Sequence, residues 1–124
     1  MKFWSKKHKQ FIFGCAYFSN GKVFSVSQMT LVDNITEDIV VSEKAFAKKD
    51  KKGNQIYENQ IVKFGNAGEE LFVIKKHDGG FYAFSNDGKN DAQKSKISAY
   101  FWNDKSFGGI EILGDIFENS DLLS

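Results

Sequence analysis

The sequence predicts a mostly β fold, an antiparallel barrel or sandwich of about six to eight short strands with at most one or two short helices. Apolar residues alternate with a period of two along much of the chain, and turn-forming residues recur roughly every ten positions. Proline, which disrupts strand ladders, is absent. Whether the strands close into a barrel or form two stacked sheets stays open.

The first expected element is a β-hairpin within residues 10–32. Apolar side chains occupy the odd positions from Phe11 to Tyr17. The Asn20-Gly21 pair that follows tolerates positive φ at both central positions of a type I′ turn. The even positions of the first strand are also mostly apolar, which indicates a strand covered on both faces.

Two structures compete for residues 35–47. Asn34, followed three positions later by Glu37, fits the pattern of a helix capping box. The β-branched run at positions 39–41 instead favours extended chain. We expect a strand, with a helix as the alternative.

Two more hairpins are expected beyond this point. One joins residues 40–47 to residues 55–64 through a lysine-rich loop, and the other joins residues 71–76 to residues 81–85 through Asp78-Gly79. The remaining expected elements are an exposed polar loop at 86–95, a strand at 96–102, a turn at 103–109 and a strand at 110–113.

At 124 residues, the chain has room for one domain with its own core. We expect a basic N-terminal arm over residues 1–9, a single β domain over residues 10–114 and an acidic C-terminal tail over residues 115–124. The one cysteine and the lack of an apolar run after the basic N-terminus indicate a cytoplasmic protein without a membrane partner. The oligomeric state, including a homo-oligomer, stays open.

All seventeen basic residues are lysines, and sixteen acidic residues bring the formal net charge to +1. Lysine is a flexible point charge that suits a phosphate backbone, whereas arginine is the usual reader of guanine edges. The composition therefore excludes a polybasic condenser of nucleic acid and favours local contacts that do not read sequence.

No motif points to an enzyme, a cofactor or a metal site. Cys15 lies in an apolar strand, where a thiol is normally an inert small hydrophobe. His8 and His77 lack the short ligand spacing of metal sites. The glycine pairs are turn glycines, and the acidic pairs lie in loops.

Lysines and aromatic residues alternate in the central hairpin and in a later strand. Bases can stack on such rings while ammonium groups neutralise phosphates. Two ordinary explanations stay open, because a charge run is often only a solvated face and aromatic residues often pack in a core. The candidate nucleic-acid contacts are Lys44, Phe46, Lys48, Lys49, Lys51, Lys52, Tyr57, Lys63, Tyr100 and Trp102.

The stretch from Lys44 to Tyr57, together with the acidic tail after Gly114, resembles small single-stranded-DNA-binding proteins of phages and mobile elements. That resemblance implies an oligonucleotide-binding barrel and cooperative binding without sequence preference. It also implies that the acidic C-terminus recruits a protein partner.

Two functions are therefore expected from different classes. The first is non-enzymatic binding of single-stranded DNA by lysine contacts to phosphate and aromatic stacking on bases. The alternative is a small protein-binding module, such as a phage or plasmid inhibitor, immunity protein or assembly protein. It would act through a sheet edge or an aromatic patch.

Overall fold

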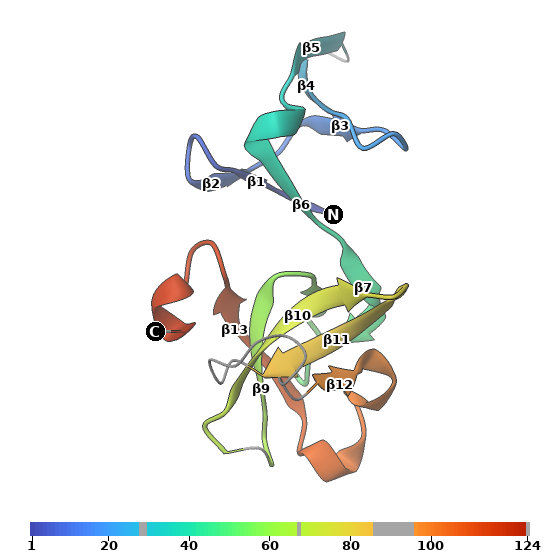
Figure 1. The fold of residues 1–124 in the computed structure, drawn as a ribbon, viewed down its shortest axis with the longest axis vertical. Helices are drawn as coiled ribbons and strands as arrows, with labels where there is room; N and C mark the ends of the chain where they lie inside the picture. The colour runs from blue at the N-terminus through green and yellow to red at the C-terminus, as the bar shows by residue number, and fades with distance from the viewer. Residues whose placement is uncertain (28–29, 67, 86–95, 124) are drawn as a thin grey trace. The chain divides into compact units, whose positions relative to one another are not determined.

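The computed structural model describes residues 1–27, 30–66, 68–85 and 96–123 (Figure 1). The chain forms two compact units, Met1–Ser42 (unit 1) and Glu43–Ser124 (unit 2). Strands predominate, joined by short 3₁₀ turns, and no α-helix occurs among the described residues. The mostly β prediction is therefore confirmed. No helix in these ranges is long and apolar enough to cross a membrane.

The strands of unit 1 are β1 (Lys2–Ser5), β2 (Gln10–Ile12), β3 (Cys15–Tyr17), β4 (Val23–Ser27), β5 (Thr30–Asn34) and β6 (Ile39–Ser42). Those of unit 2 are β7 (Lys44–Lys49), β8 (Gln55–Tyr57), β9 (Gln60–Phe64), β10 (Leu71–His77), β11 (Gly80–Ser85), β12 (Lys96–Ser98) and β13 (Ile110–Asp115). The 3₁₀ turns are η1 (Thr36–Asp38), η2 (Ala99–Phe101), η3 (Lys105–Phe107) and η4 (Ser120–Leu123).

Unit 1 contains two antiparallel three-stranded sheets, ordered β2-β1-β6 and β3-β4-β5. The expected hairpin at Asn20-Gly21 is confirmed, because β3 pairs with β4 across this turn and Gly21 has a φ of 86°. The first strand differs from the expectation. Gly14 adopts a φ of 73° and separates β2 from β3, so the two halves join different sheets.

Residues 1–9, expected as an arm, instead belong to a sheet. Strand β1 pairs with both β2 and β6, and Trp4 and Ser5 are buried. The Asp38 carboxylate accepts hydrogen bonds from the Ser5 hydroxyl at 2.6 Å and from the Lys7 N–H at 2.7 Å. These bonds, led by the one from Ser5, lower the pKa of Asp38. Tertiary hydrogen bonds thus order the basic N-terminal segment.

The strand expected within residues 35–47 is confirmed, because β6 and β7 occupy most of this range. The expected capping box is not formed: the N-cap of η1 is Ile35, which makes no side-chain capping bond, and the Asn34 side-chain oxygen instead accepts a local hydrogen bond from the Thr36 N–H at 3.1 Å. The helical turn η1 stops after three residues, and the β-branched run then continues as β6.

Unit 2 is built on a five-stranded antiparallel sheet ordered β12-β11-β10-β9-β13, and β7 and β8 form a separate pair. Within the described ranges none of the sheets closes as a barrel. The third expected hairpin is confirmed: β10 pairs with β11 across a turn in which Asp78 and Gly79 have φ values of 48° and 78°. The loop expected at 86–95 lies outside the described residues.

One face of the five-stranded sheet carries the core of unit 2. Strands β9, β10 and β11 contribute Val62, Phe64, Phe72, Ile74, Phe81 and Ala83 to this core. The β7–β8 pair adds Ala45 and Ile56 to the same cluster, so this pair covers the core face of the sheet. Phe64 and Phe72 meet edge to face, with ring centroids 5.2 Å apart.

The strand expected at 96–102 ends early. After Ser98 the chain turns into η2, where the Ser98 hydroxyl accepts a hydrogen bond from the Tyr100 N–H at 3.4 Å. Lys96, Tyr100 and Trp102 therefore do not project from one strand face. Tyr100 is 82% exposed, whereas Trp102 is fully buried.

The acidic tail is folded where it is described. Strand β13 continues to Asp115, whose carboxylate accepts hydrogen bonds from the N–H groups of Phe117 and Glu118 at 2.9 and 2.8 Å. The Ile116 N–H donates to the Asn59 carbonyl at 2.9 Å. The start of the tail thereby belongs to unit 2, and residues 10–114, expected as one domain, span parts of both units.

Replacing Trp102 with alanine should lower the free energy of unfolding of unit 2 by about 3–5 kcal/mol, because the change leaves a large cavity. The Ile97 carbonyl also loses the indole N–H that donates to it at 2.9 Å. Urea unfolding followed by circular dichroism measures the change. Tyr100→Ala is the matched control and should shift stability by no more than about 0.5 kcal/mol. Equal losses in the two variants would contradict the packing described here.

Candidate nucleic-acid interface

Most of the predicted contacts lie on one element, which we call the basic hairpin: β7, the loop Asp50–Asn54 and β8 (Figure 1). Lys44 lies directly opposite Tyr57 in the strand pair, and Lys49 lies opposite Gln55. Five steps along β7 thus match two along β8, so β7 bulges between these pairs. The hairpin expected from residues 40–47 and 55–64 is confirmed in part: β7 pairs with β8 across a loop shorter than predicted, whereas β6 and β9, within the same predicted arms, join other sheets.

The Gln55 side chain stabilises this bulge. Its amide nitrogen donates to the carbonyls of Phe46, Lys48 and Ile56 at 3.1, 3.0 and 2.9 Å. A side-chain amide thereby satisfies carbonyls that an irregular strand pair leaves without ladder partners. The irregular backbone of β7 is consequently a hydrogen-bonded feature of the fold.

Phe46 projects outward from the bulge. Its φ of 54° is left-handed, an uncommon conformation for a residue with a side chain. The ring is 55% exposed and packs edge to face on Phe81, with centroids 5.0 Å apart and an interplanar angle of 85°. An aromatic ring is therefore fixed in position and open to solvent between the lysines of β7.

The loop at the tip is organised by Asp50, which is only 6% exposed. Its carboxylate accepts hydrogen bonds from the N–H groups of Asn54 at 2.8 Å, Lys52 at 3.0 Å and Ile112 at 3.4 Å. The Lys51 N–H also donates to the Ile110 carbonyl at 2.9 Å. The tip is thus joined to β13.

The pKa of Asp50 reflects two opposing effects. Burial by itself raises the pKa, but the N–H groups of Asn54, Ile112 and Lys52 outweigh it and hold the pKa below its ordinary value of 3.8. Because the folded pKa lies below the unfolded one, this carboxylate stabilises the fold above the unfolded value. That contribution is lost as pH falls through the folded pKa.

The lysines of the site fall into two groups. Lys51 and Lys63 lie 3.2 and 3.9 Å from the carboxylate oxygens of Glu111, and the hydrogen bond from Lys51 is the main cause that lowers the pKa of Glu111. The other four have no carboxylate within ion-pair distance in the part of the chain that the structure describes. They are Lys44, Lys48, Lys49 and Lys52.

The two remaining candidates lie beside η2 rather than on the hairpin. Tyr100 is exposed and contacts Phe101, with centroids 5.1 Å apart. The Asn103 side chain donates to the Lys49 carbonyl at 3.2 Å and so connects this segment to β7. The assignment of Trp102 as a stacking residue is wrong. Its ring is sealed in the core, with the indole N–H bonded to the Ile97 carbonyl.

An aromatic cluster that was not predicted from the sequence lies on the other face of the five-stranded sheet. His77, Tyr82 and Phe84 lie there with ring centroids 6.0–6.2 Å apart, and the Lys96 ammonium group stands 5.3 Å from the Tyr82 ring centre. The two-residue turn at Asp78-Gly79 sets the register of β10 and β11, so strand parity could have revealed this cluster.

Two observations concern possible metal ligands and the thiol among the described residues. Across these ranges no group of three or more His, Cys, Asp or Glu side chains is placed to hold a metal ion. Cys15 is half-buried, and this burial raises the pKa of its thiol. A raised pKa favours the thiol over the nucleophilic thiolate.

Replacing Asp50 with asparagine should destabilise unit 2 by about 1–3 kcal/mol at pH 7, because the new amide lacks the charge and can turn an NH₂ group toward a backbone N–H. Urea unfolding of both proteins between pH 3 and pH 7 measures the difference. It should shrink as the pH falls below about 4, because this carboxylate is protonated first in the unfolded chain and, at a lower pH, in the folded one. A difference that stays constant with pH would contradict the role of the charge.

Comparison with known proteins finds a similar solved structure and a matching protein family. The crystal structure of protein EF1440 from Enterococcus faecalis matches with a TM-score of 0.64 and 18% sequence identity, covering 99% of this chain and 96% of that one. At this identity the likeness shows the fold alone. None of the curated proteins matches. The model of the YopX protein family matches residues 3–124. The chain belongs to the YopX protein family.

Proposed function

We propose that this protein binds single-stranded nucleic acid, DNA in the first instance, without sequence preference through the basic hairpin of unit 2. One observation supports the proposal: four lysines without a carboxylate partner in the described structure lie on the same hairpin as Phe46, a ring that is 55% exposed on the bulged strand β7. The chemistry is non-covalent, and the proposal requires neither a closed oligonucleotide-binding barrel nor a cofactor.

The lysines and the aromatic rings contribute to binding in different ways. Lysine ammonium groups neutralise phosphates and release counterions, which supplies sequence-independent affinity. A base that stacks on Phe46 adds about 1–3 kcal/mol, and this contribution tolerates any base because every base has a π face. Tyr57, opposite Lys44, and the exposed Tyr100 are the further stacking candidates.

Within unit 2, the charge pattern favours this surface. Unit 2 contains twelve lysines and thirteen acidic residues, so it has no general attraction for a polyanion. Attraction arises only where lysines lie apart from carboxylates, as on the basic hairpin. The acidic tail, whose Leu122 is 40% exposed, is proposed as the contact for a protein partner.

Replacing Lys44, Lys48, Lys49 and Lys52 together with glutamine should weaken binding to oligo(dT) and flatten its salt dependence. The slope of log affinity against log salt should fall by about 0.7 per lysine removed. Fluorescence anisotropy of labelled oligo(dT) at several salt concentrations gives both quantities. Labelled RNA and duplex DNA in the same assay define the preferred polynucleotide. The label belongs on the oligonucleotide, because Trp4 and Trp102 are both buried.

The matched control for this variant removes four exposed lysines of unit 1, Lys6, Lys7, Lys9 and Lys22, and should leave oligo(dT) affinity nearly unchanged. Wild-type protein that fails to bind oligo(dT) at low salt contradicts the proposed function. Equal losses in the two lysine variants would contradict the proposed site.

Replacing Phe46 with leucine should lower oligo(dT) affinity roughly 5- to 150-fold, the equivalent of one lost stacking contact, and leave the salt slope unchanged. Leucine keeps an apolar contact for Phe81 but offers no flat ring. Phe18→Leu in unit 1, where the ring is 39% exposed, is the control and should bind as wild type. Unchanged affinity in Phe46→Leu would remove stacking from the account.

A further inference from the structure

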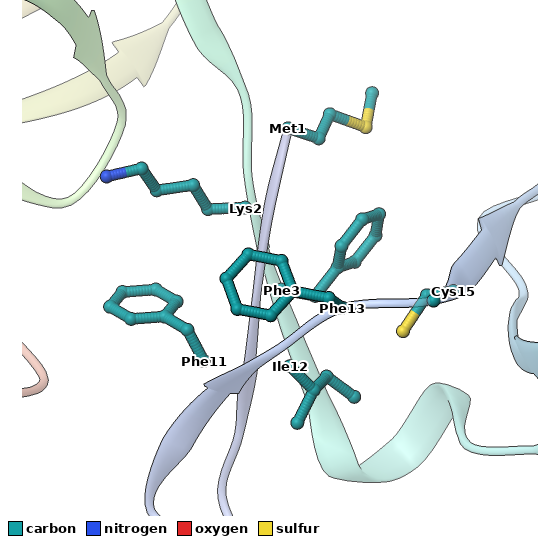
Figure 2. A pocket seen from close by; sticks show the side chains of 8 residues that line it. Met1, Lys2, Phe3, Phe11, Ile12, Phe13 and Cys15 are labelled. Carbon is teal, nitrogen blue, oxygen red and sulfur yellow. The ribbon is translucent and has the colours of Figure 1, made fainter.

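Two groups of aromatic rings lie outside the proposed site. One is found in unit 1, where three phenylalanine rings line an apolar pocket of about 260 Å³ (Figure 2). The other lies on the face of the five-stranded sheet opposite its core. We call it the sheet-face cluster, and it consists of His77, Tyr82, Phe84 and Lys96. Only the sheet-face cluster belongs to unit 2, the compact unit that carries the basic hairpin.

Strand register fixes the side chains of this cluster on one face. Tyr82 and Phe84 alternate with core residues along β11, so their rings point away from the core. Lys96 lies opposite Phe84 in the β11–β12 pair. His77 and Lys96 are exposed, whereas Tyr82 and Phe84 are half-buried. The sheet therefore supports the rings from below and leaves part of each ring accessible to a ligand.

The cluster combines flat rings with positive charge. Strands β10, β11 and β12 contain no acidic residue. Lys96 has no carboxylate within ion-pair distance in the described part of the chain, and its Nζ stands 5.3 Å from the centroid of the Tyr82 ring. A nucleotide carries both a flat base that stacks on a ring and a phosphate that an ammonium group neutralises. Both of its parts thus have a counterpart on this face.

A short folded segment connects the cluster to the basic hairpin. It begins at Ser98, which lies opposite Tyr82, and it ends at Asn103, whose side chain donates to a carbonyl of β7 at 3.2 Å. Between these two residues, Tyr100 and Phe101 are 82% and 46% exposed. Five chain steps span at most about 18 Å, which roughly five stacked nucleotides cover at about 3.4 Å each. Exposed rings therefore accompany the connection between the two surfaces.

We infer that a single strand bound at the basic hairpin continues past η2 onto the sheet-face cluster. There its bases stack on Tyr82 and Phe84, and a phosphate contacts Lys96. This second segment presupposes the proposed function, binding at the hairpin, and extends it. The effect of the cluster should therefore depend on strand length, because a short oligonucleotide fills the hairpin alone, whereas a longer one also reaches the sheet face.

The test measures the fluorescence anisotropy of labelled oligo(dT) of about four and about fifteen nucleotides, one shorter and one longer than this span. Tyr82→Leu should weaken binding of the long oligonucleotide roughly fivefold or more, the equivalent of one lost stacking contact, and leave binding of the short one unchanged. Lys96→Gln, a change at an exposed side chain, should lower the salt slope by about 0.7 for the long oligonucleotide alone. Phe13→Leu, which alters a 92% exposed ring of the unit 1 pocket, is the matched control and should bind both as wild type.

The two oligonucleotides separate a failure of this second segment from a failure of the hairpin site. Wild-type behaviour of both Tyr82→Leu and Lys96→Gln with the long oligonucleotide would overturn the inference, leave binding at the hairpin intact and assign the cluster to a protein partner. Equal losses for the short and long oligonucleotides would also overturn it, since the cluster would then be the primary site. A matching loss in Phe13→Leu would place the second segment on unit 1 instead. Wild-type protein that binds neither oligonucleotide would overturn the proposed function as well.

Discussion

The buried Asp50 carboxylate is the interaction on which the proposed binding surface depends. It lies between the tip of the basic hairpin and β13 and accepts N–H groups from both. Carboxylates that accept backbone N–H groups form strong, charge-assisted hydrogen bonds. A negative charge thus holds in place a loop that carries Lys51 and Lys52, next to the strand β7 that carries Lys44, Lys48 and Lys49.

The acids of unit 2 also decide which lysines are available. Glu111 takes up Lys51 and Lys63, and Glu43 pairs with Lys76 at 3.1 Å. Exposed pairs of this kind contribute little to stability. Their main consequence is that some lysines of unit 2 are neutralised by a carboxylate while others are not. The free charge lies on the same hairpin as Phe46, and we propose this combination as the local site for a polyanion on a nearly neutral chain.

Local patterns in the sequence predicted two hairpin turns, because Asn-Gly and Asp-Gly favour tight turns. Asp78 and Gly79 both have a positive φ, whereas at the first turn only Gly21 does. The division into two units was not foreseen, since it depends on which strands pair across long separations, as β1 with β6. Parity arguments failed where the strand was broken. Trp102 shares parity with Lys96, yet η2 rotates it into the core. Phe46 was correctly singled out, but its exposure comes from a bulge that needs Gln55 across the hairpin.

The most direct test of the central claim is to map backbone amide chemical shifts by NMR while oligo(dT) is added to the full chain. The account predicts that the largest changes occur in β7, in the loop Asp50–Asn54 and in β8, with smaller ones near Tyr100. Shifts confined to unit 1 or to the cluster of His77, Tyr82 and Phe84, or no shifts at low salt, would contradict it.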